Sequence, residues 1–179
     1  MNKDARTRLR AFVDESKAKD SLLVSVALEV SAVQDARDAV RSLILPGQSR
    51  LHMRKESDRR RRSIVNALAV PTISTTVIRA PKDGRTDRER RSACIDALVR
   101  AAVSDGIDRI CFEIDETQQR QDRQRIVETL HRLRPLTVEH RHERASNEPL
   151  LALPDAVGWA WAKGGDRRRR CGPVRVTEV

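Results

Sequence analysis

The sequence predicts one α/β domain whose sheet is mixed, with both parallel and antiparallel strands. From residue 55 onward, helix-like and strand-like segments alternate, and this alternation is typical of crossover connections between parallel strands. Before that region, the apolar segments 9–14 and 21–30 are separated by a short link, which favours an antiparallel hairpin. The chain has 179 residues and no evident repeat or linker, so we expect residues 1–163 to form a single domain and residues 164–179 a basic C-terminal tail.

The first half of the chain supplies two helices and a further strand. Residues 31–45 carry apolar side chains at helical spacing, and Pro46-Gly47 ends that helix. After a short extended piece at 50–53, residues 55–69 form a basic helix that keeps one apolar face. The β-branched run 72–78 is typical of a strand.

The second half continues the alternation. An amphipathic helix over 87–104 ends at Gly106, because glycine readily adopts the left-handed conformation that follows a helix. The remaining predicted elements are a strand over 108–114, a polar helix over 118–133, a strand over 136–142 and a helix over 154–162.

Carboxylates lie at the ends of three predicted apolar elements. Asp14 ends the first strand, and Asp155 opens the last helix. Glu113 and Asp115 close the run 110–115, which spans the end of the strand over 108–114. If the fold brings these acids together, their mutual repulsion costs free energy unless a cation binds between them. The sequence therefore predicts a metal-dependent, acid-based active site.

The geometry of strands favours this clustering. Glu113 and Asp115 point to the same face of their strand, since side chains alternate along an extended chain. Ligands of open α/β sheets bind outside the carboxyl ends of the strands, where Asp14 also lies. Asp155 can point back to that edge from the first turn of its helix, and Gly158, one turn later, is expected to leave that face open.

Each acid also has a simpler interpretation. Asp155 complements the dipole of its helix, a contribution of roughly 0.3–1 kcal/mol. Asp115-Glu116 starts a loop, and Asp14-Glu15 forms a turn after the strand. We prefer Glu113 to Asp115 as the middle metal ligand because Glu113 lies within the strand, on rigid backbone, and Asp115 stays as the alternative.

Three histidines are further candidates. His52 lies in the short piece at 50–53, where it orients a substrate phosphate, transfers a proton or serves as an ordinary structural histidine. His140 and His142 share one face of a predicted strand, an arrangement that suits a transition metal and equally suits a polar edge strand.

Arginine dominates the basic residues, and the formal net charge is +10. GC-rich codon usage explains arginine in place of lysine, but it does not explain the surplus of bases over acids, so affinity for a polyanion is a fair inference. Two dense runs are the predicted nucleic-acid contacts: Arg59, Arg60, Arg61 and Arg62, and Arg167, Arg168, Arg169 and Arg170. A third basic run, 88–91, is interrupted by Glu89. A solvated face is the simpler interpretation of any one run, whereas three runs in one chain favour an electrostatic footprint for nucleic acid.

Composition excludes several classes of protein. With no Tyr, two Phe and two Trp, the chain lacks the rings of a binder that stacks single-stranded bases. The three cysteines include no CxxC pair, which excludes a zinc knuckle and disfavours a disulfide framework. No apolar leader or membrane-spanning segment is present, so we expect a cytoplasmic protein with reduced thiols and no membrane partner.

Four short motifs lie in order along residues 9–163: Ala11-Phe12-Val13-Asp14-Glu15-Ser16, Arg50-Leu51-His52-Met53, Ile110-Cys111-Phe112-Glu113-Ile114-Asp115 and Leu150 to Ala160. In this order they resemble segments of uncharacterised bacterial proteins of the ribonuclease H-like superfamily. The resemblance implies a ribonuclease H-like fold with a mixed five-stranded sheet, and metal ligation by Asp14, Glu113 and Asp155. Ribonucleases H carry a further acid on a helix, for which the nearest candidates here are Glu56 and Asp58.

The leading prediction is a nuclease that uses Mg²⁺ or Mn²⁺ to hydrolyse the phosphodiester bonds of DNA, RNA or a hybrid. One-ion and two-ion sites fit equally well. A non-catalytic nucleic-acid-binding module of the same fold is the first alternative, since a fold does not imply a function. A structural or interaction protein, basic through codon usage alone, is the second. The sequence predicts no oligomeric state.

Overall fold

The computed structural model describes residues 7–17, 20–68, 74–133 and 138–179, so the predicted positions 69, 72–73 and 136–137 and the chain start lie outside the described residues. The strands are β1 (Leu9–Lys17), β2 (Ser21–Glu29), β3 (Ser74–Ala80), β4 (Ile107–Glu113), β5 (Glu139–Glu143) and β6 (Val174–Glu178). The α-helices are α1 (Val33–Ser42), α2 (Asp58–Leu68), α3 (Asp87–Ser104), α4 (Gln119–Leu133), α5 (Ala152–Lys163) and α6 (Gly165–Arg169). Short 3₁₀ turns cover η1 (Val30–Ala32), η2 (Met53–Lys55) and η3 (Pro149–Leu151).

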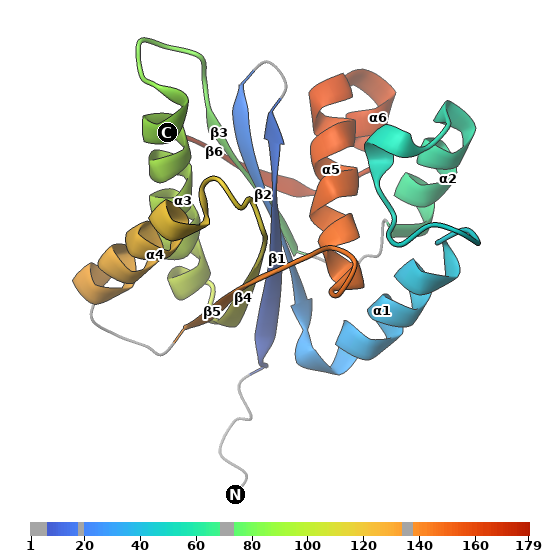
Figure 1. Cartoon of the computed structure of the whole chain (residues 1–179), viewed down its shortest axis with the longest axis horizontal. Coiled ribbons are helices and arrows are strands. Elements are labelled where there is room, and N and C mark those ends of the chain that lie inside the picture. The colour runs from blue at the N-terminus through green and yellow to red at the C-terminus, as the bar shows by residue number, and fades with distance from the viewer. Residues whose placement is uncertain (1–6, 18–19, 69–73, 134–137) are drawn as a thin grey trace, which may run out of the picture.

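One mixed sheet forms the centre of the molecule, with the strand order β5-β4-β1-β2-β3-β6. β2 runs antiparallel to both β1 and β3, whereas β4 is parallel to β1 and β5 is parallel to β4. Helices α3 and α4 cover one face, and α1, α2 and α5 lie on the other (Figure 1). The predicted α/β class, the opening hairpin and the parallel half of the sheet are therefore confirmed.

The sheet has six strands rather than the five expected. Residues 164–179, which we expected to form a basic tail, contain α6 and β6. β6 pairs in parallel with the edge of β3, where Thr75 lies opposite Val174 and Arg79 opposite Glu178. Pairing satisfies backbone groups that a bare edge would expose. The strand is short and follows a run of arginines, so its alternating pattern carries little sequence signal.

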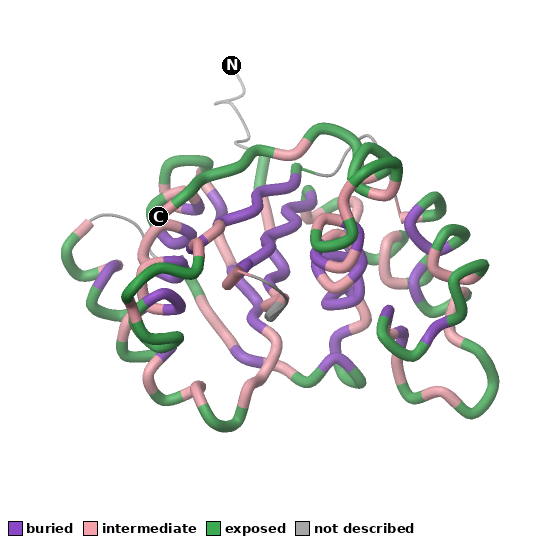
Figure 2. The backbone as a smooth tube through the Cα atoms, turned by 90° about the horizontal axis from the view of Figure 1, so that it is seen from above, coloured by how far each residue is buried: buried purple, intermediate pink, exposed green. Residues whose placement is uncertain are grey.

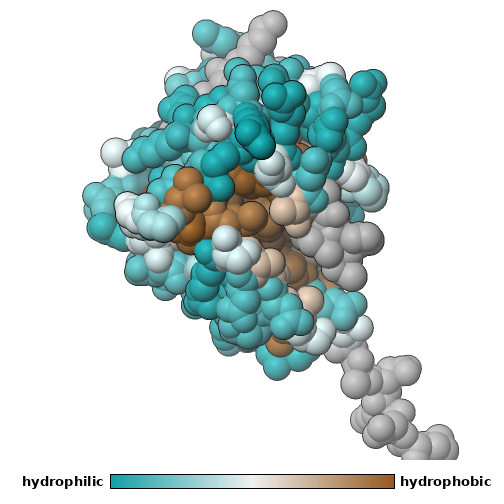
Figure 3. All heavy atoms as spheres, turned by 90° about the vertical axis from the view of Figure 1, so that its right-hand side faces the viewer, coloured by the Kyte–Doolittle hydropathy of each residue, from teal (hydrophilic) through white to brown (hydrophobic). Residues whose placement is uncertain are grey.

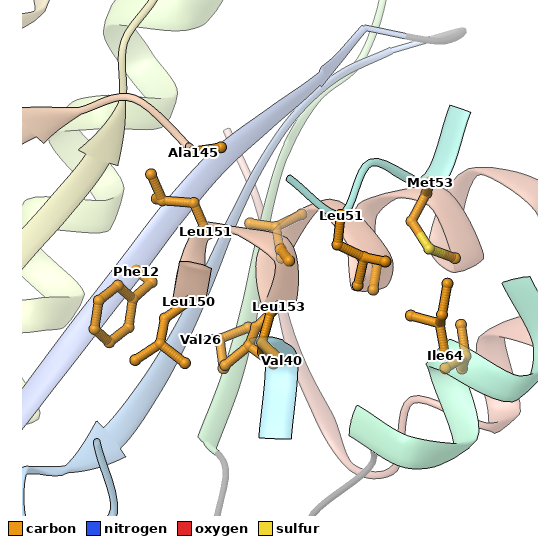
Figure 4. Packing of buried hydrophobic residues seen from close by; sticks show 14 of the residues in the cluster. Phe12, Val26, Val40, Leu51, Met53, Ile64, Ala145, Leu150, Leu151 and Leu153 are labelled. Atoms are coloured by element: carbon orange, nitrogen blue, oxygen red, sulfur yellow. The ribbon is translucent and has the colours of Figure 1, made fainter. Parts of the chain in front are cut away.

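Two apolar clusters pack on opposite faces of the sheet, and alternation along β1 assigns each residue to one of them. Phe12 belongs to the cluster under α1, α2 and α5, which Figure 4 shows together with residues of the 50–53 segment. Val13 belongs to the cluster under α3 and α4. The central strands and the inner sides of the helices are accordingly buried (Figure 2). The next residue on the Phe12 face is Asp14, which therefore faces the α5 side.

Local sequence explains the best-predicted helix. The bounds of α3 match the predicted 87–104, because Thr86 and Glu89 form a reciprocal capping box at its start. The other helices differ from prediction by a few residues at their ends, where helix boundaries depend on tertiary contacts. None of the helices in the described ranges has the length and apolar character needed to span a bilayer.

The cysteines and the surface complete the description. Cys94, Cys111 and Cys171 are all free thiols. Burial raises the pKa of the Cys94 and Cys111 thiols to about 11. On the side of the molecule that carries α1 and α2, Figure 3 shows an apolar band between hydrophilic regions.

Gly158 does not leave a face open, as the sequence had suggested, but lets α5 lie close to the sheet. A Cβ at this position would meet the Ser16 Cβ of β1 at 3.2 Å and the Val24 Cγ2 of β2 at 3.5 Å. Both neighbours belong to central, paired strands, so they have little room to move. Gly158 thus sets the distance between β1 and the helix that carries Asp155.

We expect Gly158→Val to lower the free energy of unfolding by about 1–3 kcal/mol, because the added side chain overpacks the contact between α5 and the sheet. Gly84→Val is the matched control, since Gly84 has a compatible backbone and no atom within 4 Å of an added Cβ. Its effect should stay within about 0.5 kcal/mol. Chemical denaturation of both variants measures the difference, and equal stabilities would contradict the proposed close packing.

Candidate functional site

The register between β1 and β4 brings two of the predicted acids together. The parallel pairing ends with Val13 opposite Phe112, so the next residues along the two strands are Asp14 and Glu113. Phe12 and Cys111 belong to the cluster on the α5 side, and alternation turns Asp14 and Glu113 to that same side. The two carboxylates therefore leave adjacent strands at the same edge and on the same face.

Asp155 reaches this edge from the first turn of α5. Its Oδ2 atom accepts a hydrogen bond from the backbone N–H of Met53 at 2.8 Å and lies 3.2 Å from the His52 Nδ1 atom. The 50–53 segment therefore orients this carboxylate. Predicted His52 thus contacts a predicted acid directly, through one ring nitrogen.

The three acids interact electrostatically. The pKa of Asp14 is raised well above its ordinary value, first by burial and then by the negative charges of Glu113 and Asp155. A hydrogen bond with the Glu113 side chain acts in the same direction, whereas the positive charge of Arg50 opposes it. Clustering therefore destabilises the ionised form of Asp14 in the metal-free protein.

Arg50 forms an ion pair with Glu113, from its Nη1 atom to the Oε1 atom of the glutamate. Leu51 and Met53 are buried in the core, while Arg50 and His52 alternate with them and contact the acids. Arg61 fixes this segment by donating hydrogen bonds to the carbonyls of Met53 and Arg54. The segment is thus anchored on one side and presents polar donors on the other.

A cavity of about 660 Å³ lies at this edge of the sheet. Its acidic lining residues are Asp14, Glu15, Glu113, Asp115, Glu116 and Asp155, and its basic ones are His52, Arg54, Arg61, Arg91 and Lys163. Asp155, Trp159, Ala162 and Lys163 recur at helical spacing, so one face of α5 forms a wall. The cavity lining therefore combines the acidic side chains with basic groups, of which Arg61, Arg91 and Lys163 come from α2, α3 and α5.

The donor chemistry of the cluster fits a hard divalent cation, since carboxylate oxygens are the ligands that Mg²⁺ and Mn²⁺ prefer. The spacing is not preformed: within the described ranges, no three His, Cys, Asp or Glu side chains are arranged to hold one ion. One oxygen of Glu113 faces Arg50, and one oxygen of Asp155 faces Met53 and His52. Ligation by all three acids therefore requires rearrangement of these side chains.

The alternative acids lie elsewhere or serve another contact. Asp115 lies beyond the end of β4 and accepts hydrogen bonds from the backbone and hydroxyl of Thr117, which shapes the turn into α4. Glu56 is buried and bonded to Arg60 and Gln48, and Asp58 pairs with Arg61 at the start of α2. Neither Glu56 nor Asp58 lines the cavity.

The two histidines of β5 do not form a metal site with other described residues. His142 is buried and stacks on Phe112 with ring centroids 5.2 Å apart, and neither ring nitrogen has a hydrogen-bond partner. Burial lowers the pKa of His142 to about 4 and lowers that of His140 as well. His142 is therefore a neutral core residue at physiological pH.

The two predicted arginine runs converge beside the cavity. The Trp159 ring lies under the guanidinium groups of Arg61 from α2 and Arg167 from α6, at 5.4 and 5.3 Å from its centroid. Arg170, which directly follows α6, also donates a hydrogen bond to Asn66 of α2 at 3.1 Å. The arginine runs 59–62 and 167–170, which are far apart in sequence, thus form one basic surface, called the α2–α6 surface below.

Within the two runs, the arginines divide into structural and exposed groups. Arg60 pairs with Glu56 and donates to the Leu43 carbonyl, and Arg61 binds the 50–53 segment. The exposed members are Arg59, Arg62, Arg168, Arg169 and Arg170. Arg60 and Arg61 are therefore tied into the fold, and the exposed members remain the better candidates for phosphate contacts.

Arg91 is a feature that the sequence did not predict. It is buried and bridges Glu15 of β1 and Asp122 of α4, with a distance of 2.7 Å between Arg91 Nη2 and Asp122 Oδ2. Glu15 alternates with Asp14, so it faces the α3 side. The only sequence signal was the pair of basic residues Arg90-Arg91, which is indistinguishable from an exposed run.

Comparisons with known proteins support the fold. No family model and no curated protein sequence matches the chain. Among solved structures, ribonuclease HII from the PCNA:RNase HII complex of Archaeoglobus fulgidus aligns with a TM-score of 0.58 and 15% identity, over 87% of this chain and 73% of that chain. Ribonuclease H1 from Halobacterium salinarum NRC-1 aligns at 15% identity and a TM-score of 0.34, over 82% and 93% of the two chains. The alignment with ribonuclease HII shows that the fold is ribonuclease H-like.

We expect Asp14→Asn to raise the melting temperature of the metal-free protein at pH 7.5. The pKa of Asp14 is higher in the folded protein than in the unfolded chain. The protonated carboxyl therefore stabilises the fold at pH values below the ordinary aspartate pKa, and this stabilisation is lost as pH rises through the pKa of the folded state. Asparagine cannot ionise, so the gain should be a few degrees at pH 7.5, where 1 kcal/mol corresponds to about 2–4 °C, and should shrink toward pH 4.

Calorimetry in EDTA across this pH range measures the effect, with the exposed Asp35→Asn as the control. A loss of stability at pH 7.5, or a difference that does not change with pH, would contradict the electrostatic coupling of the three acids.

Proposed function

We propose that this protein is a divalent-metal-dependent nuclease that hydrolyses the phosphodiester bonds of nucleic acid. The observation that carries the proposal is the convergence of Asp14, Glu113 and Asp155 on one cavity, where burial and mutual repulsion raise the pKa of Asp14. The ribonuclease H-like fold and the name of the aligned ribonuclease HII support the same reaction class.

Asp14, Glu113 and Asp155 are the proposed ligands of Mg²⁺ or Mn²⁺. When bound, the cation neutralises the cluster, activates a water molecule and stabilises the leaving oxygen. The chain itself positions the ligands: two come from rigid adjacent strands, and Asp155 is oriented by the Met53 N–H. His52, beside Asp155, is placed to orient a phosphate or to transfer a proton.

The basic groups of the cavity and of the α2–α6 surface are the proposed contacts for the substrate backbone. Arg54 and Lys163 are exposed at the cavity, and Arg167 lies on the Trp159 ring. Guanidinium groups bind phosphate oxygens through paired N–H donors. Such contacts hold the substrate backbone next to the acid cluster without recognising its bases. DNA, RNA and hybrids are therefore all candidate substrates.

We expect Asp14→Asn and Asp155→Asn each to reduce cleavage in Mn²⁺ or Mg²⁺ by at least about a hundredfold, because each removes a ligand charge from the reaction centre. Binding should be unchanged or tighter, since each variant removes a negative charge next to the phosphates. Single-turnover cleavage of labelled DNA, RNA and hybrid duplexes, with EDTA blanks, measures the first effect, and gel shifts in EDTA measure the second.

Asp35→Asn, on the exposed surface of α1, is the control for charge loss. Full cleavage by both site variants would exclude these acids as ligands. Salt-sensitive binding without cleavage by the wild-type protein would favour the non-catalytic binding module.

A separate prediction concerns the basic surface. If about five phosphates are contacted, log affinity should fall with log salt concentration at a slope near −4 to −5. Arg62→Gln combined with Arg169→Gln should make the slope of log affinity against log salt concentration less negative by nearly 2, because each lost phosphate contact accounts for about 0.9 of the slope. Fluorescence anisotropy over a series of salt concentrations measures both slopes.

The matched control is Arg88→Gln combined with Arg120→Gln, which removes the same charge from exposed positions on α3 and α4. An equal change of slope in the two double variants would show that net charge alone, and not the α2–α6 surface, determines binding.

A further inference from the structure

Arg50 is a charged group of the site that no role in the proposed chemistry yet requires. Within the described part of the chain, it is the one arginine that pairs with any of the three proposed metal ligands. It binds Glu113, whereas Asp155 is contacted by His52 and by the Met53 N–H from the same segment. The 50–53 segment therefore supplies the positive and hydrogen-bonding partners of two of the three acids.

The ion pair between Arg50 and Glu113 is partly open to solvent and can therefore break and re-form. Backbone position is fixed by the burial of Leu51 and by the bonds of Arg61 to the following residues, but the Arg50 side chain itself is 33% exposed and that of Glu113 is 21% exposed. Solvent competes with such a partly exposed pair, so the guanidinium can separate from Glu113 without unfolding the segment.

The Arg50–Glu113 pair also explains why the three carboxylates are close but not arranged as a ligand set. The Glu113 Oε1 atom is directed at the guanidinium, and no preformed group of three ligands occurs among the described residues. A guanidinium delivers one positive charge to one carboxylate, whereas a divalent cation delivers two and can contact several oxygens. Binding of such a cation by Glu113 competes directly with Arg50.

We propose that Arg50 is a resident counter-cation of the acid cluster, which holds Glu113 in the metal-free protein and must release it before Glu113 ligates a divalent cation. This inference rests on the proposed function, because it assumes that Glu113 is a metal ligand. In this scheme Arg50 is a positioning residue: it acts through Glu113, keeps the acids together before the cation arrives and lowers the apparent affinity for that cation.

The test is the affinity of the purified full chain for Mn²⁺, measured by electron paramagnetic resonance of the free ion. Arg50→Gln should bind Mn²⁺ about two- to fivefold more tightly than wild type, the range that corresponds to loss of one competing, partly exposed ion pair. Arg50→Lys keeps the charge and should lie closer to wild type. Arg54→Gln is the matched control, because Arg54 lines the same cavity without pairing with the three acids and its loss should have a smaller effect.

Thermal unfolding gives a second readout. In EDTA, Arg50→Gln should melt at a lower temperature than wild type, because the acids lose their counter-cation, and saturating Mn²⁺ should close that gap. Glu113→Gln should reduce the effect of Arg50→Gln on stability, since the ion-pair partner of Arg50 is lost and only its longer-range attraction to Asp14 remains.

Unchanged or weaker Mn²⁺ binding by Arg50→Gln would overturn the inference, and so would an equal gain in Arg54→Gln. Either result, obtained together with metal-dependent cleavage by the wild type, would leave the proposed nuclease function standing. Absence of Mn²⁺ binding in both wild type and Arg50→Gln would overturn both proposals.

Discussion

The parallel pairing of β1 with β4 is the constraint on which the candidate site depends. That pairing ends at Val13 and Phe112, so the next two residues, Asp14 and Glu113, lie side by side and project their carboxylates from one face of the sheet. A slip of one residue in either strand would turn one of these carboxylates toward the apolar cluster under α3 and α4. The approach of α5, which Gly158 permits, then brings Asp155 to the same place. Backbone register thus determines a site that no single motif contains.

This arrangement places like charges together in partial burial, and the surrounding fold offsets the cost. Two apolar clusters fix the sheet from both faces, and the buried Arg91 ties β1 to α4 next to the acids. The 50–53 segment adds donors to Glu113 and Asp155. Sites of this kind are commonly destabilising, because function requires charges that stability alone would remove. The raised pKa of Asp14 shows this cost directly, because burial and the neighbouring acids disfavour its ionised form.

The sequence predicted what strong local signals determine. Helix α3 was predicted to its ends from apolar periodicity and Gly106, and the capping box in the structure accounts for its start. The acids were grouped because each was predicted at the end of an element, although β1 continues beyond Asp14 to Lys17. Strand β6 was not predicted, because its partner is the distant edge of β3. The roles of Arg50 and Arg91 were also missed, since both depend on carboxylates far away in the chain. Pairing partners separated by long stretches of sequence leave no local pattern to detect.

The distribution of arginine separates two explanations of the net charge. Codon usage increases arginine everywhere, and the fold accommodates part of that increase as structural groups, such as Arg60 on Glu56 and Arg61 on the 50–53 segment. It does not explain why the runs on α2 and α6 meet around Trp159, at the wall of the cavity that holds the acids. A polyanion bound to that surface would lie next to carboxylates that repel its phosphates. A divalent cation between the acid cluster and the polyanion would offset this repulsion, which is how the proposed function connects the basic surface with the acids.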